Sequence, residues 1–305
     1  PPSIVLESIL PQPLTQKVLI RCLNLPNNNL ITFFAIRILC VAFGKLQDAL
    51  RMYREAANGS SSSMWAQSAE VLTAEFCHRC PAIKDVILAF RRFKDSDLMQ
   101  KEATTRLLVL YYEVVPRIAL DAKFGVSAAL ADNLKAMEEI ALSPQDRVLR
   151  AVELEHLFQF ANFSPGMRWF AKGDGLSVSP FMVMLKLSAE APSDLPLLKL
   201  RSVLSSVAEE NQILQTKTAH SALNTFVLGL KAIPDGAHSS AVYEFLDDCI
   251  SRCAGKPVKY IFALEEVCSS SDHGTSPVSL LSLAIVEQWR FLARSASKAE
   301  LEEVA

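Results

Sequence analysis

Hydrophobic residues recur along most of this chain at spacings of three and four, which is the period of an amphipathic α-helix. The longest example is 29–53, where apolar residues from Leu30 to Leu50 follow this spacing and charged residues fall mainly on the other side. A shorter predicted helix, 16–25, precedes it and ends in a polar turn. Helices joined by so short a turn pack antiparallel, so the pattern predicts an αα-hairpin.

The helical period continues to the end of the chain without a clean repeat length. Further helices are predicted over 64–80, 82–93, 97–121 with an interruption at Pro116, 127–142, 145–161, 179–191, 195–215, 218–232, 238–254, 258–268, 278–293 and 297–304. No stretch alternates convincingly between apolar and polar residues, so we expect no significant sheet. About a dozen helices paired by short turns predict an all-α fold, a HEAT/armadillo-like α-solenoid.

Two stretches interrupt the helical pattern. Residues 58–63, NGSSSS, predict a flexible loop. Residues 164–180, SPGMRWFAKGDGLSVSP, form the longest irregular connection, and long loops on a solenoid are frequent sites of partner binding. Because the chain begins PPSIVLES without an initiator methionine, we expect residues 1–305 to be a single solenoid segment of a longer protein.

Composition narrows the classes of function. Half of the residues are hydrophobic and 21% are charged, as in ordinary folded proteins. Only 10 residues are glycine, which argues against Gly-rich phosphate-binding loops and against all-β folds. The formal net charge is −2, so nucleic acid would have to be bound through local basic patches.

The cysteine content and the hydrophobic runs indicate the compartment. Seven cysteines lack the spacing of a disulfide framework, which is typical of a reducing compartment such as the cytosol or nucleus. No run of about 18 uncharged apolar residues occurs, and the stretch Leu30–Phe43 is interrupted by Arg37. We therefore expect no membrane-spanning segment.

Two cysteine pairs are candidate zinc ligands. Cys77 and Cys80 could chelate zinc together with Cys249 and Cys253. The pairs are about 170 residues apart, whereas zinc ribbons place theirs within ~15–20 residues. Both pairs also lie in helix-periodic sequence, so we interpret them as small buried hydrophobic residues and expect no metal or other cofactor.

No catalytic motif is recognisable. The five histidines are scattered, and Gly173-Asp174-Gly175 lacks the preceding strand and the third glycine of a dinucleotide-binding loop. We expect no enzymatic activity. A helical enzyme with a site near His156 or in the 164–180 loop remains an alternative.

The adjacent acids Asp247 and Asp248 lie in a predicted helix. Their side chains point about 100° apart, so they do not converge on one ligand. We interpret them as the solvated edge of a helix whose buried stripe includes Cys249 and Ile250. Gly255 is then expected to end this helix and Pro257 to begin the next.

Basic residues form three clusters that could touch phosphates. Aromatic rings at Phe93 and Tyr260 lie beside two of them and could stack on bases. Most of these basic residues also lie at predicted helix C-termini, where they stabilise the helix dipole, so both interpretations stay open. The candidate RNA or partner contacts are Arg51, Arg54, Arg91, Arg92, Lys94, Lys256 and Lys259.

Five segments carry a resemblance to a known family. They are ILPQPLTQKVLIRCLNLPNNNLITFFAIRILCVAFGKLQDAL (9–50), SPFMVMLKL (179–187), LPLLKLRSVLSSVAEE (195–210), VYEFLDDCISRCAGKPVKYI (242–261) and SPVSLLSLAIVEQWRFL (276–292). In this order they resemble the nucleolar pre-ribosomal-associated protein family, which are large helical scaffolds of early 60S ribosomal subunit assembly. FLDDCISRCAGKPVKY is the most specific of these stretches, and the resemblance does not extend over 58–160.

The resemblance implies a non-catalytic scaffold of the nucleus and nucleolus that binds pre-rRNA and small nucleolar RNA in pre-60S particles. It also implies protein partners, namely a second large helical scaffold protein, a DEAD-box helicase and small assembly factors. The acidic net charge also fits partner docking as the task of this segment, with RNA held elsewhere. The alternative function is a generic HEAT-type interaction or transport solenoid that binds peptide partners.

Overall fold

The computed structural model describes residues 1–25, 28–59, 62–119, 124–137, 142–173, 176–190, 197–214, 220–232, 237–269 and 278–295. These ranges contain fifteen α-helices and no strand, which confirms the all-α prediction. The chain divides into two compact units, Pro1–Phe163 (unit 1) and Ser164–Ala305 (unit 2), and each is described by itself. That both belong to one continuous solenoid stays a prediction.

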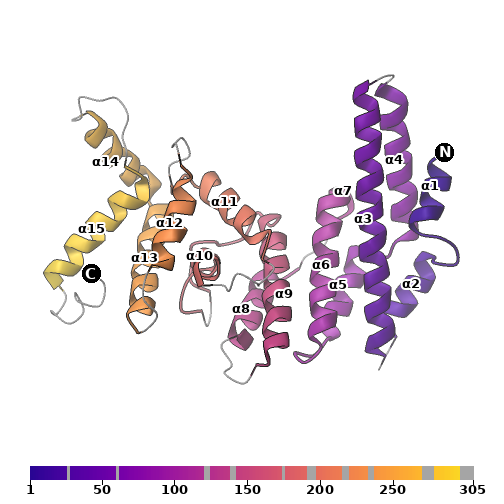
Figure 1. Ribbon diagram of the computed structural model, residues 1–305, viewed down its shortest axis with the longest axis horizontal. Coiled ribbons are helices and arrows are strands. Elements are labelled where there is room, and N and C mark those ends of the chain that lie inside the picture. Colours follow the sequence, from indigo (N-terminus) through magenta and orange to yellow (C-terminus); the bar gives the residue numbers. More distant parts are fainter. Residues whose placement is uncertain are drawn as a thin grey trace. The chain divides into compact units, whose positions relative to one another are not determined.

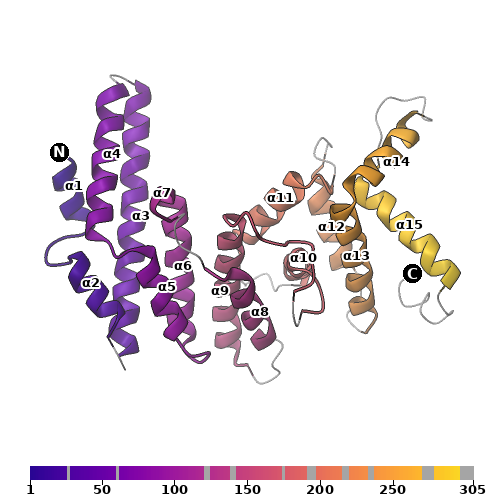
Figure 2. The same cartoon turned by 180° about the vertical axis from the view of Figure 1, so that it is seen from behind.

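Unit 1 is built from helices in two layers. α3, α6 and α9 pack side by side in one layer, and α2, α5 and α8 pack against them from the other (Figures 1 and 2). Such paired helices in successive layers are the arrangement of HEAT and armadillo repeats. The helices are α1 (Pro2–Ile9), α2 (Gln16–Leu23), α3 (Asn29–Gly59), α4 (Ser62–Arg79), α5 (Ile83–Arg92), α6 (Leu98–Val114), α7 (Pro116–Ala119), α8 (Val126–Met137) and α9 (Pro144–Asn162).

The first six helices form two successive three-helix repeats. Arg79, at the end of α4, donates from Nη1 to the carbonyl oxygen of Leu10, 3.0 Å away. Arg92, at the end of α5, donates from Nη2 to the carbonyl oxygen of Leu23 at 2.7 Å. Each pair is separated by 69 residues, and α6 likewise begins 69 residues after α3. The repeat length that the sequence pattern did not reveal is therefore present in the structure.

The core of unit 1 includes aromatic rings packed between α3, α4 and α6. The Phe43 ring packs against the rings of Phe76 and Tyr111, with centroids 5.0 and 4.5 Å apart. Tyr111 is fully buried, and its hydroxyl donates to the carbonyl oxygen of Pro81 at 2.7 Å. One large ring from α3 thus joins α4 and α6, and a buried polar group is satisfied.

α3 is apolar around more of its circumference than an amphipathic helix requires. Its buried side consists of residues such as Ile36, Leu39 and Phe43. Several residues of the predicted apolar stripe instead face outward, namely Leu30, Phe34, Ile38 and Val41. The spacing rule identified the helix, but it could not decide which of two apolar sides packs inward.

α3 is also long and apolar enough to cross a membrane, judged by length and composition alone. Of the described helices it is the one that passes this test. A central helix of a folded unit passes it as well, and α3 packs against α1, α2, α4 and α6.

Unit 2 is also formed from packed helices. α10 contacts α11, α12 and α13, and α13 contacts α14 and α15, which also contact each other. Gly255 ends α13 and Pro257 begins α14, which confirms the helix-turn-helix predicted for 242–261. The helices are α10 (Pro180–Glu190), α11 (Leu200–Glu210), α12 (Ala222–Lys231), α13 (Ala237–Gly255), α14 (Pro257–Ser269) and α15 (Leu280–Ser295).

Some predicted boundaries differ from the observed ones. α11 ends at Glu210 rather than 215, because Gln212 adopts φ 52°, in the left-handed region that ends helices. The helices beside the predicted 58–63 loop extend to Gly59 and resume at Ser62, and residues 60–61 lie outside the described part. The helix predicted at 297–304 also lies outside it, and α1 was not predicted.

The described residues of the predicted 164–180 loop form turns and bends between α9 and α10. The carbonyl oxygen of Trp169 accepts a hydrogen bond from the Phe181 amide at 3.0 Å. The rings of Phe170 and Phe181 pack 5.1 Å apart. This connection is therefore held against the start of α10. Residues 174–175, two of the three in the Gly-Asp-Gly motif, lie outside the described residues.

Candidate nucleic-acid interface

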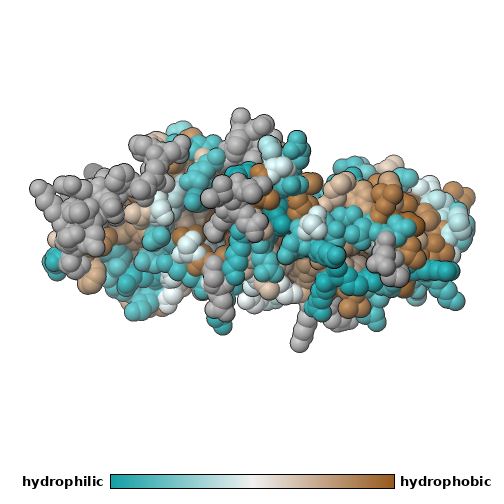
Figure 3. Space-filling model, turned by 90° about the horizontal axis from the view of Figure 1, so that it is seen from below, coloured by the Kyte–Doolittle hydropathy of each residue, from teal (hydrophilic) through white to brown (hydrophobic). Residues whose placement is uncertain are grey.

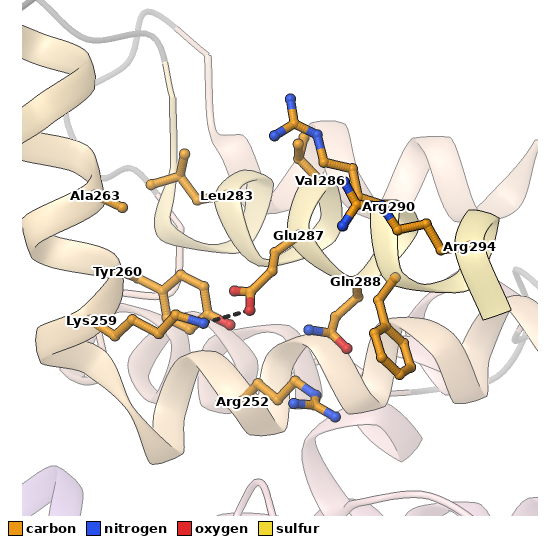
Figure 4. Close-up of a pocket in the computed structure, with 11 residues that line it drawn as sticks. Arg252, Lys259, Tyr260, Ala263, Leu283, Val286, Glu287, Gln288, Arg290 and Arg294 are labelled. Carbon is orange, nitrogen blue, oxygen red and sulfur yellow. Dashed lines mark hydrogen bonds and ion pairs between the residues drawn. The ribbon is translucent and has the colours of Figure 1, made fainter.

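A groove of about 550 Å³ lies where α13, α14 and α15 meet in unit 2 (Figure 4). The last turn of α13 and the first turns of α14 reach it because the Gly255–Pro257 turn places these two segments side by side. α15 supplies its largest wall, from residues about one helical turn apart. The lining residues are Arg252, Lys259, Tyr260, Ala263, Leu283, Val286, Glu287, Gln288, Arg290, Phe291 and Arg294.

The charged side chains of the lining are mainly basic. It has four basic side chains, Arg252, Lys259, Arg290 and Arg294, and one carboxylate, Glu287. This excess contrasts with the net charge of −2 for the whole chain. A local concentration of cations is the feature expected of a phosphate-binding surface on an otherwise acidic protein.

Glu287 of α15 points toward Lys259 and Tyr260 of α14 (Figure 4). Lys259 Nζ is 2.5 Å from Glu287 Oε1, and their side chains are about half exposed. The hydrogen bond from Lys259 lowers the pKa of Glu287, and burial raises the pKa of Tyr260 to about 12, with Glu287 adding to the effect. Glu287 is therefore ionised at neutral pH and Tyr260 stays a neutral donor.

Aromatic surface adjoins these charges. Phe291 lines the groove with 65% of its surface exposed. Tyr260, whose ring centre lies 5.2 Å from Lys259 Nζ, is buried, so the suggestion that it stacks on a base is wrong. Exposed rings beside cations can stack on unpaired bases while the cations hold the backbone. The arrangement suits single-stranded or looped RNA better than a small polar substrate.

The structure separates the basic residues predicted as contacts. Lys259 lines the groove, whereas Lys256 is exposed at the α13–α14 turn and does not line it. The other five belong to unit 1. Sequence reasoning missed Arg252, Arg290 and Arg294, although the spacing of four between the last two places them on one side of a helix.

The unit 1 candidates have internal contacts. Arg51 pairs with Asp48 at 2.8 Å, and Arg54 Nε donates to the carbonyl oxygen of Leu50 at 3.3 Å. Arg92 caps α2, as described above. Arg91 and Lys94 are exposed.

A second depression of about 570 Å³ brings Arg92 and Lys94 together beside Phe93. Because the Arg92 guanidinium already serves a backbone carbonyl and Asp97 also lines this depression, its cationic character is weaker than that of the α13–α15 groove.

The interpretation of Asp247 as part of a solvated edge is wrong. Its side chain is buried, and it accepts hydrogen bonds from the Ser179 amide, at 3.0 Å, and from the Ser179 hydroxyl. Burial raises the pKa of Asp247, against the opposing effect of the Ser179 hydrogen bonds and Lys172. Asp248 is exposed, as expected, and pairs with Lys172 at 3.2 Å. The carboxylate of Asp247 therefore anchors the start of α10.

The cysteines considered as zinc ligands are packed between helices. Cys80, Cys249 and Cys253 are buried, and Cys77 is partly buried. Burial raises the pKa of Cys249 to about 12, so this thiol is protonated in the structure. In the described part of the chain, no group of three His, Cys, Asp or Glu side chains could hold a metal ion.

His156, the residue considered for an alternative enzyme site, lies in the α6–α9 interface. Its Nδ1 is 3.9 Å from Glu102 Oε1, and both side chains are largely covered. Burial raises the pKa of Glu102, with Arg37 and Arg106 opposing it. Neither pocket described above includes this pair.

The packed helices of the two units, which lie in paired layers in unit 1, define the class of protein as an α-helical repeat protein. Comparison with family models is consistent with this class. Residues 164–305 match the model described as URB1, central HEAT repeat domain, and these bounds are those of unit 2. Residues 164–305 are thus similar to a HEAT repeat domain, in agreement with the resemblance noted from sequence for the four segments between 179 and 292. The fifth segment, 9–50, lies outside the match. No curated protein and no solved structure matches the chain.

Proposed function

We propose that the chain is a non-catalytic scaffold segment of early 60S ribosomal subunit assembly in the nucleolus, and that its α13–α15 groove holds precursor ribosomal RNA. The family match supports the link to ribosome biogenesis, and HEAT repeats are non-catalytic helical folds. The observation that carries the RNA proposal is the set of four cations and one exposed aromatic ring in the matched unit. The assembly factors named above belong to the same proposal as protein partners.

A salt-dependent binding assay tests direct contact. We expect the 305-residue chain to bind single-stranded fragments of precursor large-subunit RNA, with an affinity that falls as salt rises. Arg290→Ala with Arg294→Ala removes two phosphate contacts, which should weaken binding about tenfold and reduce the salt slope by about 1–2. Glu287→Gln frees Lys259 and should strengthen binding about two- to fivefold.

The matched control is Arg201→Ala with Lys231→Ala, which removes two exposed cations from α11 and α12 outside the groove. This pair should leave affinity nearly unchanged. Equal losses in the two double variants, or binding without salt dependence, would contradict RNA recognition by this groove. In cells, crosslinking the protein to RNA and sequencing the attached fragments should recover precursor large-subunit RNA, and the absence of ribosomal RNA would overturn the assembly role.

The alternative function, a generic HEAT-type surface for peptide partners, is favoured by a different observation. Apolar residues are exposed along α3 in unit 1.

A further inference from the structure

We propose that the outer faces of α3 and α6 in unit 1 bind an acidic amphipathic helix of a partner protein. The apolar part, here termed the α3 face, consists of Leu30, Phe34, Ile38 and Val41. This inference concerns a surface separate from the RNA groove and does not depend on it.

The α3 face is an unusually apolar surface for a helix side turned to solvent. Leu30, Phe34 and Val41 expose 62%, 55% and 57% of their surface, and Ile38 is also exposed. Their spacings of four, four and three place them along one side of the helix. Apolar side chains gather at the surface of unit 1, at the right in the view from below (Figure 3). Contiguous exposed residues of this kind mark interaction sites.

Cations border the α3 face. Arg37 lies between Phe34 and Val41 in the same stripe, and Lys45 continues it by one turn. Arg106 on α6 is 69 residues after Arg37, the separation of the two three-helix repeats, so the two arginines occupy equivalent positions. Both lie close enough to Glu102 to influence its ionisation. Lys45 Nζ also donates to the carbonyl oxygen of Ser8 at 3.1 Å, and Asp48, one turn further along α3, pairs with Arg51 at 2.8 Å. With Arg37 and Arg106 beside Glu102, the border keeps a net positive charge.

The length and chemistry of this surface fit one occupant. From Leu30 to Lys45 α3 spans about 22 Å, which matches a partner helix of about four turns. A helix with an apolar side and acidic flanks would bury the α3 face and pair with the bordering cations. A second copy would bring Arg37, Lys45 and Arg106 against the same cations. RNA would leave three aliphatic side chains without a stacking partner.

Designed peptides test this chemistry. The probe is an 18-residue helix with leucines at spacings of three and four and glutamates on its flanks, compared with the same helix carrying lysines. Fluorescence anisotropy with the 305-residue chain should show at least tenfold tighter binding of the glutamate peptide, and the difference should shrink as salt rises.

Variants locate the site. Phe34→Ser with Val41→Ser should weaken binding of the glutamate peptide at least tenfold. The matched control, Val18→Ser with Leu88→Ser, removes exposed apolar residues from the other helix layer and should leave binding unchanged. Lys45→Glu should reduce the preference for glutamate over lysine at least threefold, whereas Lys17→Glu on α2 should not. Helical circular dichroism and Tm establish that each variant is folded.

Three results would overturn the proposal. The first is equal binding of the glutamate and lysine peptides, or equal losses of binding in Phe34→Ser with Val41→Ser and in its control, Val18→Ser with Leu88→Ser. The second is a dimer in sedimentation experiments that Phe34→Ser converts to monomer, which would assign the surface to a second copy. The third is displacement of the glutamate peptide by a single-stranded RNA oligonucleotide. In cells, a photo-crosslinker at Val41 should trap peptides rich in Asp and Glu with helical apolar spacing, and basic peptides would contradict the proposal.

Discussion

The function of individual charged residues depends on what the fold places around them. Asp247 and Asp248 are neighbours, yet one carboxylate is buried against Ser179 and the other is exposed beside Lys172. A helix-edge interpretation treats both alike, because local periodicity carries no information about a serine 68 residues away.

The buried position leads to a stability prediction. Asp247→Ala leaves the buried Ser179 amide without its acceptor, so we expect a loss of about 1–3 kcal/mol in the free energy of unfolding. Asp247→Asn should cost less, because the amide oxygen can still accept one of the two hydrogen bonds. Urea denaturation followed by circular dichroism measures both. Asp248→Ala is the control and should change stability by less than about 0.5 kcal/mol; equal effects at the two positions would contradict the anchoring role.

The same limit applies to the candidate interface. Lys259 could be predicted, because a basic run around a helix-turn-helix is visible in the sequence. The partners Arg252, Arg290 and Arg294 could not, because they converge only through the packing of α13, α14 and α15. Arg92 was predicted as an RNA or partner contact, and the sequence could not show that its guanidinium also donates to the carbonyl oxygen of Leu23 in unit 1.

At the scale of helices, the sequence predicted which segments are helical better than it predicted where each helix ends or which side of it is buried. Apolar spacing located fourteen of the fifteen described helices, at least in part, because burial of one side produces that spacing. α9 shows a kind of burial that the spacing of apolar residues does not predict. It is buried on several sides, and polar residues such as Arg150, Glu153 and Gln159 are covered along with its apolar ones.

The buried carboxyl of α9 should make unit 1 sensitive to pH. Glu153 accepts a hydrogen bond from Asn133 of α8 at 2.7 Å, and burial raises its pKa to about 7, although Lys101 and Arg150 oppose the shift. The folded state therefore holds this proton more tightly than the unfolded state, and the contribution to stability falls as pH rises from about 4.5 to 7.

Glu153→Gln mimics the protonated form and should remove this dependence. We expect the variant to be more stable than the natural chain by about 1–3 kcal/mol at pH 8 and nearly equal to it at pH 5. Denaturation at both pH values gives the difference. Parallel stability curves for the two proteins would contradict the assignment.

At the scale of the whole chain, the two units have separate cores, and the family match begins and ends with unit 2. The sequence pattern predicted one solenoid and gave no sign of a division into compact units, because the helical period is uniform along the chain; whether both units belong to one solenoid stays a prediction. The fold class followed from periodicity, whereas the division into units follows from which helices contact one another.

Separate cores predict separate responses to mutation. Leu107→Ala in α6 and Leu204→Ala in α11 each remove a fully buried side chain, which typically costs about 2–5 kcal/mol. Hydrogen exchange with mass spectrometry should show Leu107→Ala lowering protection within residues 1–163, and Leu204→Ala within 164–305. Loss of protection across the whole chain in either variant would show a single cooperative unit instead.

The hydrogen bonds of Arg79 and Arg92 restrict the lengths of insertions and deletions that unit 1 can accommodate. Arg79 and Arg92 reach back 69 residues to the ends of α1 and α2. Removing a few residues from α3 would shift both arginines away from those carbonyls, whereas removing or duplicating one three-helix repeat would retain the register. Insertions and deletions here are thus compatible with the fold in multiples of a repeat, so evolutionary growth or shortening of this region is expected in whole repeats.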